Sequence, residues 1–153
     1  MVTDISSPIA TINPYPSLPK TNMVPGLKNS SQNILLNLIN SERTSRNLTP
    51  LTLSSSLSKV AQDHSLDMSR NKYFSHQSPL GSTPFTRLAQ NGIPYSSAGE
   101  NIAYAPTISE IHQNLMKSQE HRQNILNPGY SKIGIGIVEV NPQKIIVTEM
   151  FIN

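Results

Sequence analysis

The stretch K-I-G-I-G-I-V-E-V-N-P-Q-K-I-I-V-T-E-M-F-I, residues 132–152, decides the fold of this chain. Isoleucine alternates with glycine over 133–137, and a second β-rich run follows over 145–152. Alternation with a period of two is typical of a strand, and Asn141-Pro142-Gln143 between the runs is typical of a turn. The stretch therefore predicts an antiparallel hairpin at the end of the chain.

The residues before the hairpin have a helical period instead, with apolar residues three and four positions apart. Ser and Thr stand at good capping positions, Pro84 suits a first helical turn, and Asn91-Gly92 suits a helix end. The predicted helices cover 30–46, 55–71, 84–90 and 107–116. Helices first and a hairpin last predict an α+β fold with helices on both faces of the sheet.

The length of 153 residues fits one domain, preceded by a segment of different composition. Five of the 12 prolines and only three charged residues lie in residues 1–29. Proline at this density disfavours helix and sheet, so we expect a flexible leader over 1–29 and a folded domain over 30–153. The leader is either a tether between an anchor and the domain or a segment without a role.

Composition excludes several classes of protein. The net charge is +3, from 12 basic and 9 acidic side chains without a dense basic run, which argues against nucleic-acid binding. No apolar stretch approaches the roughly 20 residues of a transmembrane helix. Residues 1–10 lack the features of a signal peptide, so we expect any export signal to be absent from this sequence. Without cysteine there is no disulfide and no thiolate site.

Two of the four histidines have ordinary structural interpretations. His64 is predicted on the apolar face of its helix, where a histidine is usually a hydrogen-bonded core residue. His112 lies beside Glu110 and Gln113 on a face that we expect to be wet. Neither position indicates a site.

His76 and His121 differ because both are predicted outside helix interiors. His76 follows an aromatic pair just past a helix end, and His121 stands where the fourth helix ends and a short turn begins. Glu100 lies between them as the single charge in residues 88–109. A buried carboxylate needs a partner, so His76, Glu100 and His121 are the set that can converge as a polar site.

Several motifs follow one another in an order that resembles a known family. They are Asn40-Ser41-Glu42-Arg43, Leu48-Thr49-Pro50-Leu51, Phe74-Ser75-His76, Gly99-Glu100-Asn101-Ile102-Ala103, Ser118-x-x-His121-Arg122 and Ile133-Gly134-Ile135-Gly136. The series, over residues 32–153, resembles the CAP superfamily of cysteine-rich secretory, antigen 5 and pathogenesis-related proteins, in its short, cysteine-free bacterial form. The resemblance implies an α-β-α sandwich around a three-stranded antiparallel sheet. The third strand, in addition to the two of the hairpin, would lie near 100–104.

The resemblance also implies a central ligand cleft with two histidines, acidic residues and, in several members, a divalent metal. His76, His121 and Glu100 match the family's cleft residues, whereas a second cleft glutamate would fall near Ser118 and is absent. We therefore expect a secreted or envelope-associated, monomeric binding module for a lipid, peptide or envelope component. His76 and His121 would hold the metal, with zinc the first choice, and no organic cofactor is expected.

Two alternatives remain open at this point. The domain could be a hydrolase that uses Glu100 as general base, or Ser118 as nucleophile with His121. Alternatively, Glu100 could bridge the two histidines in a purely structural network. That bridge would raise the histidine pKa values, lower the pKa of Glu100 and give maximal stability near pH 5 to 6. Arg122 and Asn124 are interpreted as structural, the first bonding helix-end carbonyls and the second capping the following turn.

Overall fold

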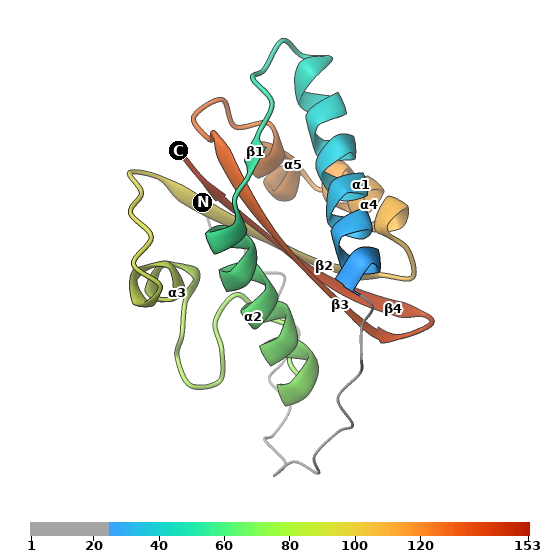
Figure 1. Cartoon of the computed structure of the whole chain (residues 1–153), viewed down its shortest axis with the longest axis vertical. Coiled ribbons are helices and arrows are strands. Elements are labelled where there is room, and N and C mark those ends of the chain that lie inside the picture. The colour runs from blue at the N-terminus through green and yellow to red at the C-terminus, as the bar shows by residue number, and fades with distance from the viewer. Residues whose placement is uncertain (1–24) are drawn as a thin grey trace.

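A four-stranded mixed sheet in the order β1-β3-β4-β2 lies at the centre of the molecule (Figure 1). The computed structural model describes residues 25–153, with side chains from residue 30 onward. The strands β3 (Lys132–Asn141) and β4 (Lys144–Ile152) form the predicted hairpin. The strand β2 (Ala98–Ala105) pairs antiparallel with β4, so the strand implied near 100–104 is present.

The fourth strand corrects the expectation of a three-stranded antiparallel sheet. The strand β1 (Thr52–Leu53) pairs in parallel with β3, opposite Lys132 and Ile133. Two residues are too few to show an alternating pattern, so no sequence signal marked this strand. Its pairing depends on contacts between segments about 80 positions apart.

Within residues 25–153, five helices surround the sheet: α1 (Pro25–Thr44), α2 (Ser55–Asn71), α3 (Pro84–Gln90), α4 (Ile108–Lys117) and α5 (Gln119–Ile125). The bounds predicted for α2 and α3 are confirmed. The helix predicted from residue 30 begins instead at Pro25, a residue that suits a first helical position. The predicted leader lies outside the described residues up to position 24, and its role stays a prediction.

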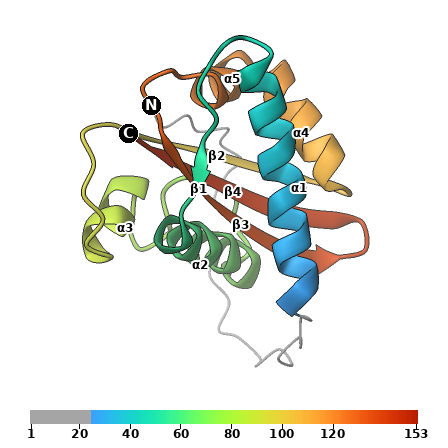
Figure 2. The ribbon, with the colours of Figure 1, turned by 45° about the horizontal axis from the view of Figure 1, so that its top comes forward.

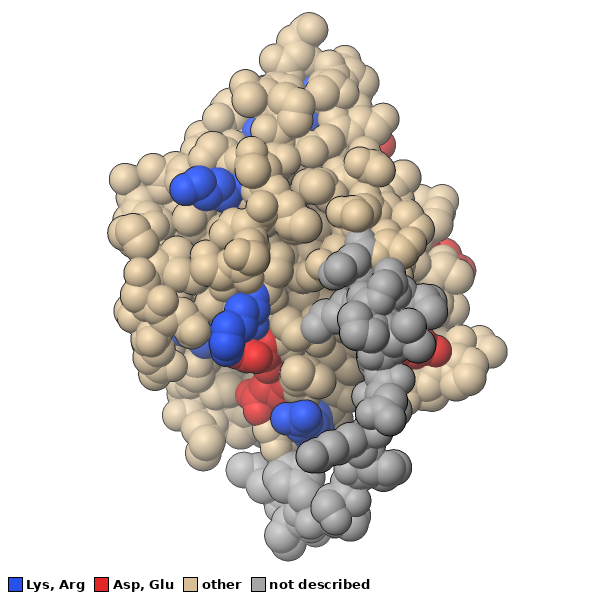
Figure 3. Space-filling model, viewed as in Figure 1, with Lys and Arg blue, Asp and Glu red and all other residues tan. Residues whose placement is uncertain are grey.

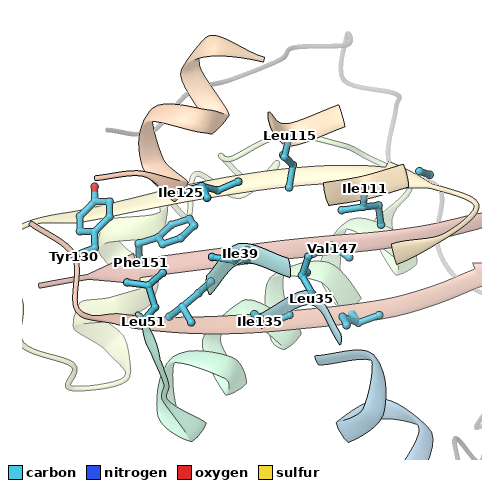
Figure 4. Close-up of a cluster of buried hydrophobic side chains, with 13 residues drawn as sticks. Leu35, Ile39, Leu51, Ile111, Leu115, Ile125, Tyr130, Ile135, Val147 and Phe151 are labelled. Atoms are coloured by element: carbon cyan, nitrogen blue, oxygen red, sulfur yellow. The ribbon is translucent and has the colours of Figure 1, made fainter. Parts of the chain in front are cut away.

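The helices form two layers, one on each face of the sheet (Figures 1 and 2). On one face α1, α4 and α5 pack against the strands, and the buried apolar side chains of this layer surround Phe151 and Val147 (Figure 4). On the other face α2 and α3 contribute Leu57, Val60 and Leu88 to a second cluster. The α-β-α arrangement is therefore confirmed.

The alternation of isoleucine and glycine in β3 reflects the two faces of this strand. Ile133 and Ile135 point into the core beneath α1, α4 and α5. Gly134 and Gly136 point toward α2, and a Cβ atom added at either glycine would lie 2.2 Å from a backbone carbon of Leu57 or Ala61. The glycines thus let α2 rest directly on the backbone of β3.

The surface carries few charges. On the described part of the face in Figure 3, lysine and arginine atoms lie in separate places without forming a continuous basic stripe. Within residues 25–153, no helix combines the length and apolar character needed to cross a membrane.

Candidate functional site

Glu100 is the centre of a buried polar cluster on the α2 and α3 side of the sheet. Side chains alternate between the two faces along β2, and Glu100 points toward α2 and α3 with no exposed surface. His76, from the loop between those helices, lies 2.7 Å from Glu100 through Nδ1 and Oε1. The other carboxylate oxygen, Oε2, accepts a hydrogen bond of 2.8 Å from Arg87 Nη2. Both oxygens of the buried carboxylate are therefore engaged.

Arg87 comes from the short helix α3 and binds more than Glu100. Its Nη1 and Nη2 atoms each lie 3.1 Å from the backbone oxygen of His76, and Nη1 also donates to Ser82 O. The side chain is largely buried, and the residue is 8% exposed. One guanidinium thus holds both the backbone of His76 and the carboxylate that contacts its ring.

The cluster keeps Glu100 ionised. Burial acts to raise the pKa of Glu100, but the hydrogen bond from His76 and the electrostatic interactions with His64 and Arg87 outweigh it, so the pKa lies below the ordinary 4.5. An ionised carboxylate only accepts hydrogen bonds. His76 Nδ1 must therefore be the donor to Glu100.

His64 is a core residue of this cluster, as predicted. It is 1% exposed, and its Nε2 donates to Ser75 O at 3.0 Å. The same nitrogen lies 3.8 Å from Glu100 Oε1, beyond hydrogen-bond distance. Burial lowers the pKa of His64 from 6.5 to about 4, so this histidine is neutral at physiological pH.

His121 comes from α5, and its backbone oxygen accepts a hydrogen bond of 3.1 Å from Asn101 Nδ2 of β2. The predicted position at a helix end is wrong, because only Ser118 separates α4 from α5 and His121 lies inside α5. Burial, followed by the electrostatic interaction with His76, lowers the pKa of His121. The Nε2 atoms of both rings are buried and lack a hydrogen-bond partner among the described residues.

Glu100 was predicted to bridge His76 and His121, and only the contact with His76 is present. Glu100 contacts His76, but its second partner is Arg87 rather than His121. The expected rise in histidine pKa is also wrong for His121, since desolvation exceeds any attraction to a carboxylate there. Arg87 was missed because nothing in the sequence distinguishes an arginine that points inward from one at the surface of a short helix.

Ser118 and His121, the alternative nucleophile and base, are not joined. Ser118 stands at the cap position of α5, is partly exposed, and makes no hydrogen bond to His121 within the described residues.

Arg122 donates to Met116 O at 2.8 Å, which confirms its predicted bond to a helix-end carbonyl. Asn124 reaches across to β2 and donates to Asn101 Oδ1 at 2.9 Å, so it ties α5 to the sheet.

A second buried carboxylate lies on the opposite face of the sheet. Glu149 of β4 is fully buried, and its Oε2 accepts a bond of 3.0 Å from Asn101 Nδ2, which also donates to His121 O. Burial raises the pKa of Glu149 to about 7, although the bond from Asn101 acts to lower it. Its place inside the apolar run over 145–152 was the sequence signal for this burial.

His112 is buried rather than on a wet face. Its side chain is 8% exposed, and its Nε2 lies 3.8 Å from Glu42 Oε1. It lines a surface groove of about 540 Å³ between α1, α4 and α5, whose other lining residues include Arg46, Lys117 and Arg122. His76, Glu100 and His121 line neither this groove nor a second one of about 520 Å³ beside α2, and all three are at most 3% exposed.

The residues near Glu100 do not form a large metal cage. In residues 25–153, no group of three or more His, Asp or Glu side chains is arranged to hold an ion. Any metal near His76 and His121 would therefore be bound by two protein ligands, through their free Nε2 atoms.

Known proteins resemble the chain in sequence. The family model described as the cysteine-rich secretory protein family, CAP, matches residues 36–151. YkwD of Bacillus subtilis (strain 168) is 41% identical over 120 residues, which cover 78% of this chain and 47% of YkwD. The membrane protein YlbC of the same organism is 33% identical over 115 residues, which cover 72% of this chain and 32% of YlbC. The chain spans less than half the length of either relative.

Solved structures resemble the chain in fold. An extracellular protein containing an SCP domain, from Bacillus anthracis, has a TM-score of 0.73 and 31% identity over 88% of this chain and 45% of that one. An outer surface protein of Borrelia burgdorferi has a TM-score of 0.77 over 82% of this chain and 94% of its own. At 21% identity, that second likeness concerns the fold alone.

Proposed function

The chain belongs to the cysteine-rich secretory protein (CAP) family, and from this premise we propose that its domain is a binding module of the cell exterior with a zinc site at His76 and His121. The ligand class that we propose is a lipid, a peptide or another envelope component. The description of one structural neighbour at 31% identity, an extracellular protein of Bacillus anthracis, supports this location.

One observation carries the zinc proposal. The Nε2 atoms of His76 and His121 are both buried and without a hydrogen-bond partner in the described part of the chain, and His76 influences His121 electrostatically. A buried nitrogen lone pair without a partner is costly, and a cation between the two rings would satisfy both. Neutral imidazole nitrogen is a good ligand of zinc, which takes about four ligands in all. Water or the bound ligand would supply the remaining positions.

The support for a hydrolase is weaker. A general base needs a free lone pair directed at the attacking water, but both oxygens of Glu100 are engaged by His76 and Arg87. Within residues 25–153, Ser118 has no bond to His121 that would activate it as a nucleophile. Binding is the function that this geometry supports best.

Calorimetric titration of zinc into metal-free protein tests the proposal. We expect one zinc ion per chain in the native protein and a loss of at least tenfold in affinity in His76→Ala or His121→Ala. His112→Ala is the matched control, because His112 is also buried and its ring nitrogen Nδ1 also lacks a partner among the described residues. Binding heat that persists in the double variant of His76 and His121 would disprove the zinc site.

A further inference from the structure

Arg87 bonds Oε2 of Glu100, the carboxylate oxygen that does not contact the ring of His76. Arginine has five N–H groups and no acceptor, and it keeps its charge in proteins. Its bond of 2.8 Å to Oε2 therefore requires an acceptor atom at that position, whatever side chain supplies it. The remaining oxygen, Oε1, is the one that faces His76 Nδ1 at 2.7 Å.

The atom that faces His76 decides the tautomer of its ring. A neutral imidazole has its hydrogen on one nitrogen and a lone pair on the other, and the hydrogen bond at one nitrogen determines the state of the other. With carboxylate Oε1 as an acceptor, the hydrogen is on Nδ1 and the lone pair on Nε2. Moving the hydrogen to Nε2 would place two lone pairs against each other in a site that is at most 3% exposed.

We propose that Arg87 is a positioning residue for His76: by bonding one terminal atom of residue 100, it decides which of the two terminal atoms faces Nδ1 of the His76 ring. Arg87 also fixes the backbone of His76 by two bonds of 3.1 Å to its carbonyl oxygen. The guanidinium thus holds the backbone of His76 and the orientation of Glu100, and the carboxylate oxygen Oε1 keeps the hydrogen of the ring on Nδ1. The consequence for zinc rests on the proposed function, whereas the tautomer itself does not.

The substitution Glu100→Gln gives a sharp test. The introduced glutamine has one carbonyl oxygen and one NH₂ group. Arg87 can bond only to the oxygen, so the NH₂ group is left facing His76 Nδ1 and must donate to it. We expect the hydrogen of His76 to move to Nε2. Ring ¹⁵N chemical shifts of His76 in metal-free protein at about pH 8, well above the ordinary histidine pKa, distinguish the two tautomers.

Substitutions of Arg87 added to Glu100→Gln test whether Arg87 is what orients the side chain of residue 100. With Arg87→Met added to Glu100→Gln, the amide oxygen is free to turn toward His76, so we expect the Nδ1–H tautomer to return. With Arg87→Lys added instead, an obligate donor remains and the hydrogen should stay on Nε2. Arg70→Met is the matched control, because Arg70 is an exposed arginine of α2, and it should not alter the effect of Glu100→Gln.

Two results would overturn the proposal. One is a Glu100→Gln protein, folded by circular dichroism, that retains the Nδ1–H tautomer. The other is a double variant with Arg87→Met that keeps the hydrogen on Nε2. If the double variant does not fold, the Glu100→Gln protein alone decides the question.

Zinc titration of the same proteins separates this proposal from the zinc site. We expect Glu100→Gln to weaken zinc binding about 10–100-fold, the usual effect of disturbing a residue behind a metal ligand, and Arg87→Met to restore part of the loss. Should the native protein bind no zinc, the proposed zinc site fails, while the tautomers of the metal-free proteins still decide the role of Arg87.

Discussion

Arg43 is a fully buried cation that has no carboxylate partner among the described residues, and four backbone oxygens surround it. It donates to the carbonyls of Thr49, Ile125, Asn127 and Tyr130 at 2.8–3.2 Å. The carbonyl of Thr49 comes from the loop after α1 and that of Ile125 from the last residue of α5. The other two come from the segment between α5 and β3. One side chain thus joins the end of α1 to the loop that carries the chain into the hairpin.

We expect Arg43→Met to destabilise the protein by about 3–5 kcal/mol, because several buried carbonyl groups lose their donor at once. Denaturant unfolding followed by circular dichroism measures the loss. Arg46→Met is the control in the same segment, since Arg46 is exposed and its ion pair with Glu42 should contribute no more than about 1 kcal/mol. Equal losses in the two variants would contradict this role of Arg43.

At the scale of residues, the sequence indicated which side chains need partners, but it identified only some of those partners. A lone glutamate in an uncharged stretch predicted burial and pairing, and Glu100 is buried and paired with His76. The second partner, Arg87, is 13 positions away on another element and faces inward only because α3 lies over β2. Which of several arginines faces inward is set by the packing of elements, and a local pattern does not contain that information.

At the scale of elements, α2 and β3 illustrate how a small residue sets the distance between layers. Gly136→Ala would place a Cβ atom 2.2 Å from the backbone carbonyl carbon of Ala61, and backbone atoms cannot move aside as a flexible side chain can. We expect a loss of about 3 kcal/mol or more, because α2 must shift away from the sheet. Thermal or denaturant unfolding measures it.

Gly129→Ala is the matched control for that substitution. Its added Cβ would lie 3.1 Å from the side-chain oxygen of Asn127, in an exposed turn. We expect a change within about 1 kcal/mol. A folded Gly136→Ala protein with native stability would show that α2 does not rest on β3 as closely as described.

The elements that the sequence predicted are those with strong local signals. A serine cap and a helical period define α2, and alternation around a turn defines the hairpin. The two elements without such signals were missed: β1 has two residues, and α5 has seven and follows α4 without a loop. Both are short segments held by tertiary contacts, such as the bond from Ser54 N to Ile133 O.

At the scale of the whole molecule, the sheet separates two buried carboxylates with opposite electrostatic environments. Glu100 faces α2 and α3, where it accepts hydrogen bonds from Arg87 and His76, and its pKa is lowered. Glu149 faces α5 with the neutral amide of Asn101, and burial raises its pKa to about 7. Adjacent positions on β2, Glu100 and Asn101, take part in the two environments because they point to opposite faces.

These environments predict how stability depends on pH. Because the pKa of Glu100 is lowered in the folded protein, this group stabilises the fold above about pH 4.5, its ordinary pKa. That stabilisation is lost on acidification. The pKa values of His64, His112 and His121 are lowered by burial, so the unfolded chain takes up protons first as the pH falls below 6.5, and stability falls. This direction is opposite to the histidine contribution expected from the sequence, because burial outweighs attraction to carboxylates.

Glu149 acts against these groups, and Glu149→Gln isolates its contribution. The unfolded chain releases the proton of Glu149 near pH 4.5 and the folded protein holds it to about 7, so stability from this group declines over that interval and is constant above it. We expect Glu149→Gln to match the native protein at pH 4 and to exceed its stability by roughly 3 kcal/mol at pH 8. In the variant, the lowered pKa values of Glu100 and of the three histidines all favour the folded state as the pH rises. Its stability should therefore increase from pH 4 to 7. Urea unfolding at unit pH intervals measures both curves, and a difference between the two proteins that does not change with pH would contradict a proton held on Glu149.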